Sequence, residues 1–150
     1  MLNLELRKNW RLNWIVSLYE FANPKLQYMS WVEGPSANWP KDSIWCSSPV
    51  ECFCGYFDDL ALSDRDGGYA EMKKEGLVNE EEASLLANFH SLASKYNGQV
   101  DKPIMVLDDP NWKNITREAS LAWTQLKKVI EEPAEKEKMQ ELENTYGKIN

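Results

Sequence analysis

The sequence has a single histidine and lacks the short motifs that identify the common enzyme classes. It contains no Gly-x-Ser-x-Gly elbow, no phosphate-binding loop, no dinucleotide fingerprint and no His-Glu-x-x-His helix. Catalysis usually depends on a titratable group whose pKa is tuned by its neighbours. His90, beside Phe89 in a predicted helix, is typical of a hydrogen-bonded structural residue. We therefore predict a protein that is not an enzyme and has neither catalytic residues nor a cofactor.

Cysteine is also scarce, and its number is odd. The three cysteines lie close together in the chain: Cys46, Cys52 and Cys54. An odd number without a secretory signal argues against a disulfide framework, and Cys-x-Cys with a distant His90 is a poor zinc pattern. The pair Asp64-x-Asp66 suggests a calcium loop, but Gly68 offers no side-chain ligand. Tyr69 also replaces the glycine that such a loop needs. We expect reduced thiols and no metal site.

Long apolar runs and an excess of basic residues are missing as well. No run approaches the length of a membrane span, and residues 1–10 carry charges where a secretory signal would be apolar. The net charge is −7 and the isoelectric point is about 4.8. Nucleic acids and anionic lipids attract clustered Lys and Arg instead. We therefore expect a cytoplasmic protein that binds neither nucleic acid nor membrane.

What the sequence does contain is a series of helix starts. Five segments open with a capping residue, three of them followed by proline: Asn3, Asn23-Pro24, Ser48-Pro49, Asn79 and Asp109-Pro110. Glu82 completes a capping box with Asn79. Apolar residues then recur every three or four positions, as on one buried helical face. The first such stripe is Leu6, Trp10, Trp14, Leu18 and Phe21, and the stripe in a helix over 49–62 is Val50, Phe53, Phe57 and Leu60.

Only residues 103–107 resemble a strand, and a single strand cannot form a sheet. Residues 34–48 are rich in Gly, Pro and Ser and predict an ordered loop. The segment 134–146 is highly charged with a thin apolar edge, so we expect it to dock loosely. With 150 residues, the chain suits one domain. The prediction is an all-α protein in which residues 1–150 form a single compact domain of six or seven helices.

The net negative charge lies in one window, residues 51–82. This window holds ten acids against Arg65, Lys73 and Lys74, whereas the other 118 residues hold 14 acids and 14 bases. Such a run is usually a solvated surface that confers solubility. A concentrated field also steers and selects a positively charged partner. We predict partner contacts, with Tyr69 as aromatic anchor, at these acids: Asp58, Asp59, Asp64, Asp66, Glu71 and Glu75.

Several short segments also resemble parts of a known class of bacterial proteins. They are Phe57-Asp58-Asp59-Leu60, Gly76-Leu77-Val78-x-Glu80-Glu81-Glu82-Ala83, Phe89-His90, Asp109-Pro110-x-Trp112 and Ala119-x-x-Ala122-Trp123-x-x-Leu126. Over about half of the chain, they are similar to immunity proteins of contact-dependent growth inhibition and related polymorphic toxin systems. The resemblance implies an antitoxin that binds and neutralises one cognate toxin with a basic surface, such as a nuclease, in the cytoplasm of the producing cell.

Two alternatives stay open. The first is a small helical enzyme that uses His90, which a concave pocket holding His90 beside Cys52, Cys54 or an Asp would favour. His90 buried with its nitrogens bonded to backbone would exclude it. The second is a regulatory domain with a peptide or protein partner, which the sequence does not distinguish from an immunity protein.

Overall fold

The computed structural model describes residues 3–34 and 47–149. Within these ranges the chain forms eight α-helices and no strand. The all-α prediction is confirmed, with slightly more helices than the six or seven expected. The helices are α1 (Leu4–Ala22), α2 (Pro24–Tyr28), α3 (Pro49–Cys54), α4 (Gly68–Lys74), α5 (Glu80–Lys95), α6 (Pro103–Asp108), α7 (Pro110–Val129) and α8 (Pro133–Tyr146). Two π-helical turns, η1 (Met29–Glu33) and η2 (Gly55–Asp59), continue α2 and α3, and a 3₁₀ turn, η3 (Asp64–Asp66), precedes α4.

The predicted helix starts are confirmed by their hydrogen bonds. Asn3, Asn23, Ser48 and Asp109 each accept a backbone N–H of the first turn of the helix that follows. At α5 the capping box is complete, because Asn79 accepts the Glu82 N–H at 2.8 Å and Glu82 accepts the Asn79 N–H at 3.0 Å. These bonds satisfy backbone donors that the first turn of a helix leaves free. Local sequence therefore sets where each of these helices begins.

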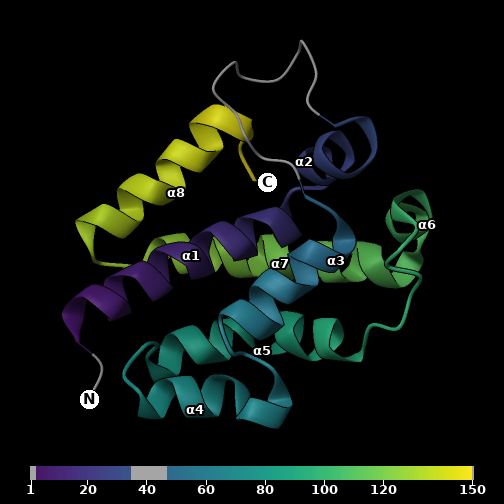
Figure 1. The fold of residues 1–150 in the computed structure, drawn as a ribbon. Coiled ribbons are helices and arrows are strands. Elements are labelled where there is room, and N and C mark those ends of the chain that lie inside the picture. The colour runs from purple at the N-terminus through teal and green to yellow at the C-terminus, as the bar shows by residue number, and fades with distance from the viewer. Residues whose placement is uncertain (1–2, 35–46, 150) are drawn as a thin grey trace.

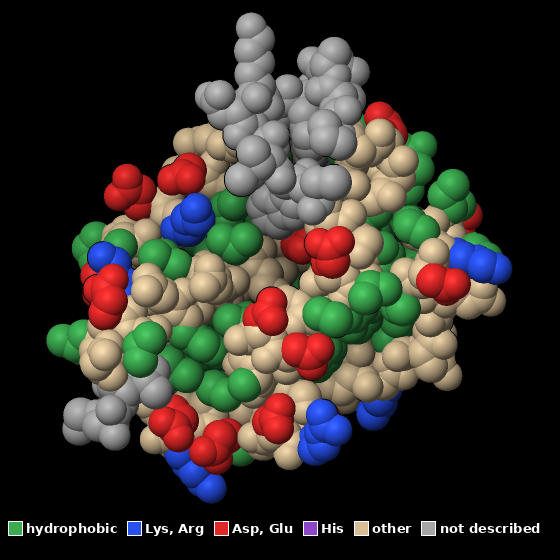
Figure 2. Space-filling view, in the orientation of Figure 1, with side chains coloured by type: hydrophobic (Ala, Val, Ile, Leu, Met, Phe, Trp, Pro, Cys, Tyr) green, Lys and Arg blue, Asp and Glu red, His purple; other side chains and the backbone are tan. Residues whose placement is uncertain are grey.

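Helix α7 packs between α1 and α5, and α8 lies along α1 (Figure 1), with Glu143 near its C-terminal end bonded to Trp123 and Lys127 of α7. Helix α3 crosses in front of this layer, and α4 lies beside α5. Phe21 occupies the centre of the core, with ring centroids 5.0 Å from Phe89, 5.5 Å from Tyr56 and 5.7 Å from Trp112. Aromatic pairs at these separations add to the free energy gained by burying their area. Hydrophobic side chains on the outer surface are interspersed with charged ones (Figure 2).

The structure corrects three local predictions. Residues 103–107 lie in α6 and not in a strand, since Pro103 starts a helix whose Val106 packs against the core. Leu6 is exposed because the first turns of α1 extend beyond the core, and Val50 is exposed because α3 turns Cys52 inward instead. A short apolar run does not distinguish a strand from a helix without its surroundings. Most of the predicted 34–48 loop, residues 35–46, lies outside the described residues.

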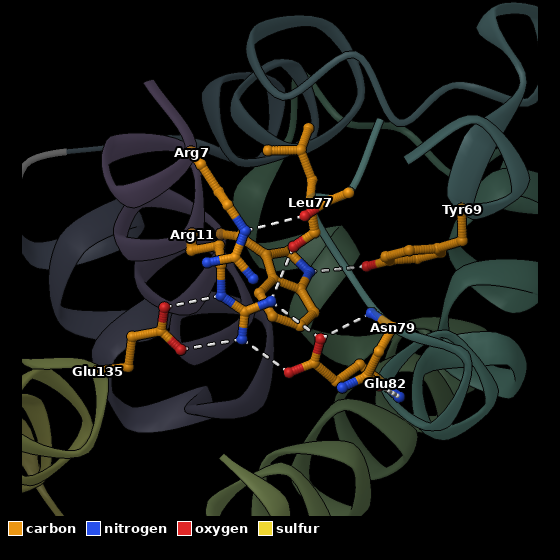
Figure 3. A network of polar contacts seen from close by, with 9 residues as sticks. Arg7, Arg11, Tyr69, Leu77, Asn79, Glu82 and Glu135 are labelled. Carbon is orange, nitrogen blue, oxygen red and sulfur yellow. Dashed lines mark hydrogen bonds and ion pairs between the residues drawn. The ribbon is translucent and has the colours of Figure 1, made fainter. Parts of the chain in front are cut away.

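Helix α8 does not dock loosely, because a buried ionic network joins it to α1 and α5 (Figure 3). Arg11 of α1 donates to Glu135 of α8 at 2.7 and 2.9 Å and to Glu82 of α5 at 2.7 and 2.9 Å. It also donates to the Leu77 carbonyl at 2.8 Å. All three charged side chains are about 95% buried. This bidentate geometry on both sides satisfies most of the guanidinium donors.

The network shifts the pKa values of its members. Burial lowers the pKa of Arg11, but the hydrogen bonds and charges of Glu82 and Glu135 outweigh burial and raise it. Burial raises the pKa of Glu82, but hydrogen bonds from Arg11 and the Asn79 N–H outweigh burial and lower it. At the other end of α8, burial raises the pKa of Glu143, but hydrogen bonds from Lys127, the Ile149 N–H and Trp123 outweigh burial and lower it.

We expect Arg11→Met to lower the free energy of unfolding by about 3–5 kcal/mol, because it leaves two carboxylates buried without a cation. Urea unfolding followed by circular dichroism measures the loss. The matched control is Arg7→Met on the same helix, where the side chain is exposed and donates to one carbonyl, so the loss should stay below about 1 kcal/mol. Adding Glu82→Gln and Glu135→Gln to Arg11→Met should restore part of the stability. Equal losses for Arg11→Met and Arg7→Met would contradict the role of this network.

The lowered pKa of Glu82 also predicts how stability depends on pH. A carboxyl whose pKa is lower in the folded than in the unfolded state adds stability above its unfolded pKa, about 4.3 for Glu. That stability is lost as the pH falls through the folded pKa. We therefore expect the free energy of unfolding to fall below about pH 4.3. In Glu82→Gln, which cannot titrate, this fall should be shallower, and a fall of the same steepness would contradict the assignment. Urea unfolding at pH 7 and pH 3.5 gives the comparison.

Candidate functional site

The acids predicted to contact a partner lie in one part of the fold, on η2, η3 and α4. Asp58 and Asp59 end η2, Asp64 and Asp66 belong to η3, and Glu71 and Glu75 lie in α4 and at its end. All are exposed except Glu71, which is half-buried. We call these six residues the acidic surface. In the view of Figure 2, acidic side chains recur over α3, η2 and α4, with basic side chains mostly toward the rim.

The ion pairs of the described residues leave most of the acidic surface without a cation. Of the other acids in the window 51–82, Glu80 pairs with Lys73 at 2.9 Å and Glu82 is buried against Arg11. Asp64 bonds to His90. The remaining five members of the acidic surface form no ion pair within residues 3–34 and 47–149: Asp58, Asp59, Asp66, Glu71 and Glu75. Their negative charge is therefore directed to solvent.

Tyr69 is not the surface anchor that the sequence predicts. Its side chain is buried, with 8% exposed, because α4 turns Tyr69 and Met72 inward onto the core. The Tyr69 hydroxyl accepts the Trp14 Nε1–H at 2.9 Å and bonds to the Tyr56 hydroxyl at 2.8 Å. Burial raises the pKa of both tyrosines. A partner would therefore meet the carboxylates around Tyr69 and not its ring.

A chain of hydrogen bonds leads from this core contact to the acidic surface. The Tyr56 hydroxyl bonds to Nδ1 of His90 at 2.9 Å, and Nε2 of His90 bonds to Oδ1 of Asp64 at 2.9 Å. Because an ionised carboxylate only accepts, Nε2 is the donor in this pair. The chain therefore runs Trp14–Tyr69–Tyr56–His90–Asp64 and joins α1, α4, η2, α5 and η3. We call it the polar chain. It fixes Asp64 to the buried core.

His90 has the setting that favours the enzyme alternative, a hollow shared with an Asp, and not the backbone-bonded setting that would exclude it. It is buried, but both ring nitrogens bond side chains and not backbone. It also lines a hollow of about 460 Å³ together with Asp64, as an enzyme would require. Cys52 and Cys54 do not line this hollow. Cys52 is buried, and its burial and the nearby Glu20 both raise the pKa of its thiol. Cys54 is exposed.

Gly68 lies close to the His90–Asp64 pair. It has a φ of +55°, which glycine adopts without strain. A Cβ at this position would lie 3.1 Å from Oδ1 of Asp64 and 3.6 Å from Nε2 of His90. A larger residue would therefore be strained and would press on the pair. The sequence contained this glycine, but only the fold shows what it contacts.

A second hollow, of about 320 Å³, lies on the other side of Asp64. We call it the aromatic hollow. Its lining is mixed: Phe53, Phe57, Ser63, Asp64, Ala93, Ser94 and Tyr96. Asp64 and Ser94 line both hollows, so the two are adjacent. Sequence analysis missed this site, because Phe53 and Phe57 in a predicted helix look like ordinary core residues and Tyr96 lies some forty positions away.

Residues 3–34 and 47–149 hold neither a metal-ligand cluster nor a membrane-spanning helix. No group of three His, Cys, Asp or Glu side chains in the described ranges is placed to hold a metal ion. Over the same ranges, none of the helices has both the length and the hydropathy needed to cross a bilayer.

No family model, curated protein or solved structure matches the chain. The resemblance to immunity proteins therefore stays a prediction.

We expect Tyr56→Phe to lower the free energy of unfolding by about 1–3 kcal/mol, because it removes the central hydroxyl of the polar chain and leaves buried polar atoms of Tyr69 and His90 without this partner. Tyr28→Phe is the matched control, since Tyr28 is exposed, and should change stability by less than about 0.5 kcal/mol. Urea unfolding measures both. A loss for Tyr56→Phe as small as that of the control would show that the polar chain contributes nothing.

Proposed function

We propose that this protein is a bacterial immunity protein that binds a cognate toxin with a basic surface and neutralises it in the cytoplasm. The six carboxylates of the acidic surface make the contact, and the buried Tyr69 takes no part in it. The observation that carries the proposal is the set of five carboxylates on η2, η3 and α4 that form no ion pair with a lysine or arginine of the described residues. A surface of one sign raises the rate of encounter with a partner of the opposite sign, by about 10- to 1000-fold.

The support of these carboxylates also favours binding. Buried Leu60 and Leu62 flank the turn between η2 and η3, and buried Met72 anchors α4. Asp64 is tied to the core by the polar chain. Charges on short, anchored elements lose little conformational freedom when a partner arrives, and this lowers the cost of association.

A helical enzyme is the second candidate, since His90 and Asp64 line a hollow. We favour binding because both nitrogens of His90 already have partners in the polar chain, and neither described cysteine lines that hollow. The two functions differ in stoichiometry. A binder protects in proportion to its amount and reaches an end point near one molecule per toxin, whereas an enzyme protects when present in far smaller amounts.

We propose that the cognate toxin is encoded beside this chain, and the test uses that toxin domain, purified and titrated with the protein. We expect the triple variant Asp58→Lys, Asp59→Lys, Glu75→Lys to slow association by about 10- to 100-fold at low ionic strength, because it reverses the field that attracts the toxin. Stopped-flow fluorescence measures the rate. Growth of bacteria that express the toxin together with each variant gives the biological result.

The matched control is Asp101→Lys, Asp108→Lys, Glu137→Lys, which changes the net charge equally at exposed positions outside the window. It should slow association far less than the first triple. Equal rates for the two triples would overturn the proposed contact surface. If the neighbouring genes encode no toxin against which the protein protects, the immunity function itself is wrong.

A further inference from the structure

One wall of the aromatic hollow is a row of three nearly parallel rings. Phe53 lies in the middle, with its ring centroid 5.9 Å from Phe57 at an interplanar angle of 11° and 5.7 Å from Tyr96 at 7°. All three rings are half-buried and line the hollow, so they combine apolar area with access from outside. Rings stacked in a row turn their faces toward one another, so the faces that can attract a cation through the ring quadrupole are the outer ones, of Phe57 and Tyr96.

Asp64 is the one charged side chain among the described residues that line this hollow. Its side chain is 70% exposed. His90 holds one oxygen of Asp64, Oδ1, whereas Oδ2 forms no hydrogen bond with any described residue. Among the described residues that line this hollow, none is a lysine or arginine. Lys95 lines the neighbouring hollow, which shares Asp64, but Asp64 forms no ion pair with a lysine or arginine of the described residues. An incoming cation would therefore meet an available carboxylate.

We propose that the aromatic hollow receives an arginine side chain of the basic partner. The guanidinium stacks on the outer face of a ring at one end of the row and donates hydrogen bonds to the carboxylate of Asp64, while the aliphatic stem covers the apolar wall. This inference rests on the proposed function and adds the chemistry of one contact to it. Arginine fits better than lysine, because its planar group both stacks on rings and donates in parallel to a carboxylate.

The neighbouring hollow is less suited to the same occupant. It shares Asp64 and Ser94, but Lys95 lines it too, and the rings on its lining, Tyr69 and His90, meet edge to face at 72° and form no parallel row. An arginine placed there would face a resident cation. The aromatic hollow is thus the subsite that a guanidinium prefers, and Asp64 is its polar end.

The test measures the affinities of nona-arginine and nona-lysine peptides by isothermal titration calorimetry at low ionic strength. We expect the wild-type protein to bind nona-arginine about tenfold more tightly than nona-lysine, the difference that stacking and paired hydrogen bonds supply. Ser94→Trp fills the hollow from an exposed position without changing charge, and Asp64→Asn removes the charge while keeping the shape. Both should bring the ratio of the two affinities close to one.

Two controls separate this inference from the proposed function. Ser84→Trp adds the same side chain at another exposed position of α5 and should keep the ratio. The triple reversal of Asp58, Asp59 and Glu75 should weaken both peptides while arginine stays preferred. A wild-type ratio of one, or a ratio that Ser94→Trp leaves unchanged in a folded variant, would overturn the subsite. The slowed association of the triple variant with the toxin would still support the acidic surface.

Discussion

The tertiary structure depends on one buried cation, Arg11, held between carboxylates of two other helices. A guanidinium out of water is stable only when its donors are matched, so α5 and α8 must each deliver a carboxylate to the same point on α1. Glu82 does so while it also caps its own helix, which couples the start of α5 to the position of α1. Because the Arg11–Glu82 pair fixes the position of α5 against α1, it also fixes the positions of the residues farther along α5.

His90 and Ser94 lie farther along α5, and they connect this support to the candidate site. His90 holds Asp64 through the polar chain, and Ser94 lies where the two hollows meet. The surface that we propose for binding is therefore not a free loop. Its charges rest on a core whose parts fit together through hydrogen bonds as well as apolar packing. Such support favours a partner that binds a prearranged surface.

The acidic window illustrates how charge and burial separate. By sequence, Glu82 and Asp58 are equivalent members of one run of acids, yet Glu82 is an internal partner of Arg11 and Asp58 faces solvent. Tyr69 looks like an exposed aromatic among acids, yet it is a core residue. Composition shows that a field exists, but the fold selects which carboxylates contribute to it. The proposed contact set is smaller than the charge run for this reason.

The sequence by itself determined the helix class and most helix starts, because capping residues such as Asn79 and Ser48 act on backbone groups only three positions away. Only the tertiary structure decided that 103–107 is helical, that α8 is held by Glu135, and that Phe53, Tyr96 and Asp64 share one hollow. The physical reason is the separation along the chain between the residues that interact. Caps and apolar periodicity are local, whereas a buried ion pair or a ring row joins residues tens of positions apart, and their meeting depends on how whole helices pack.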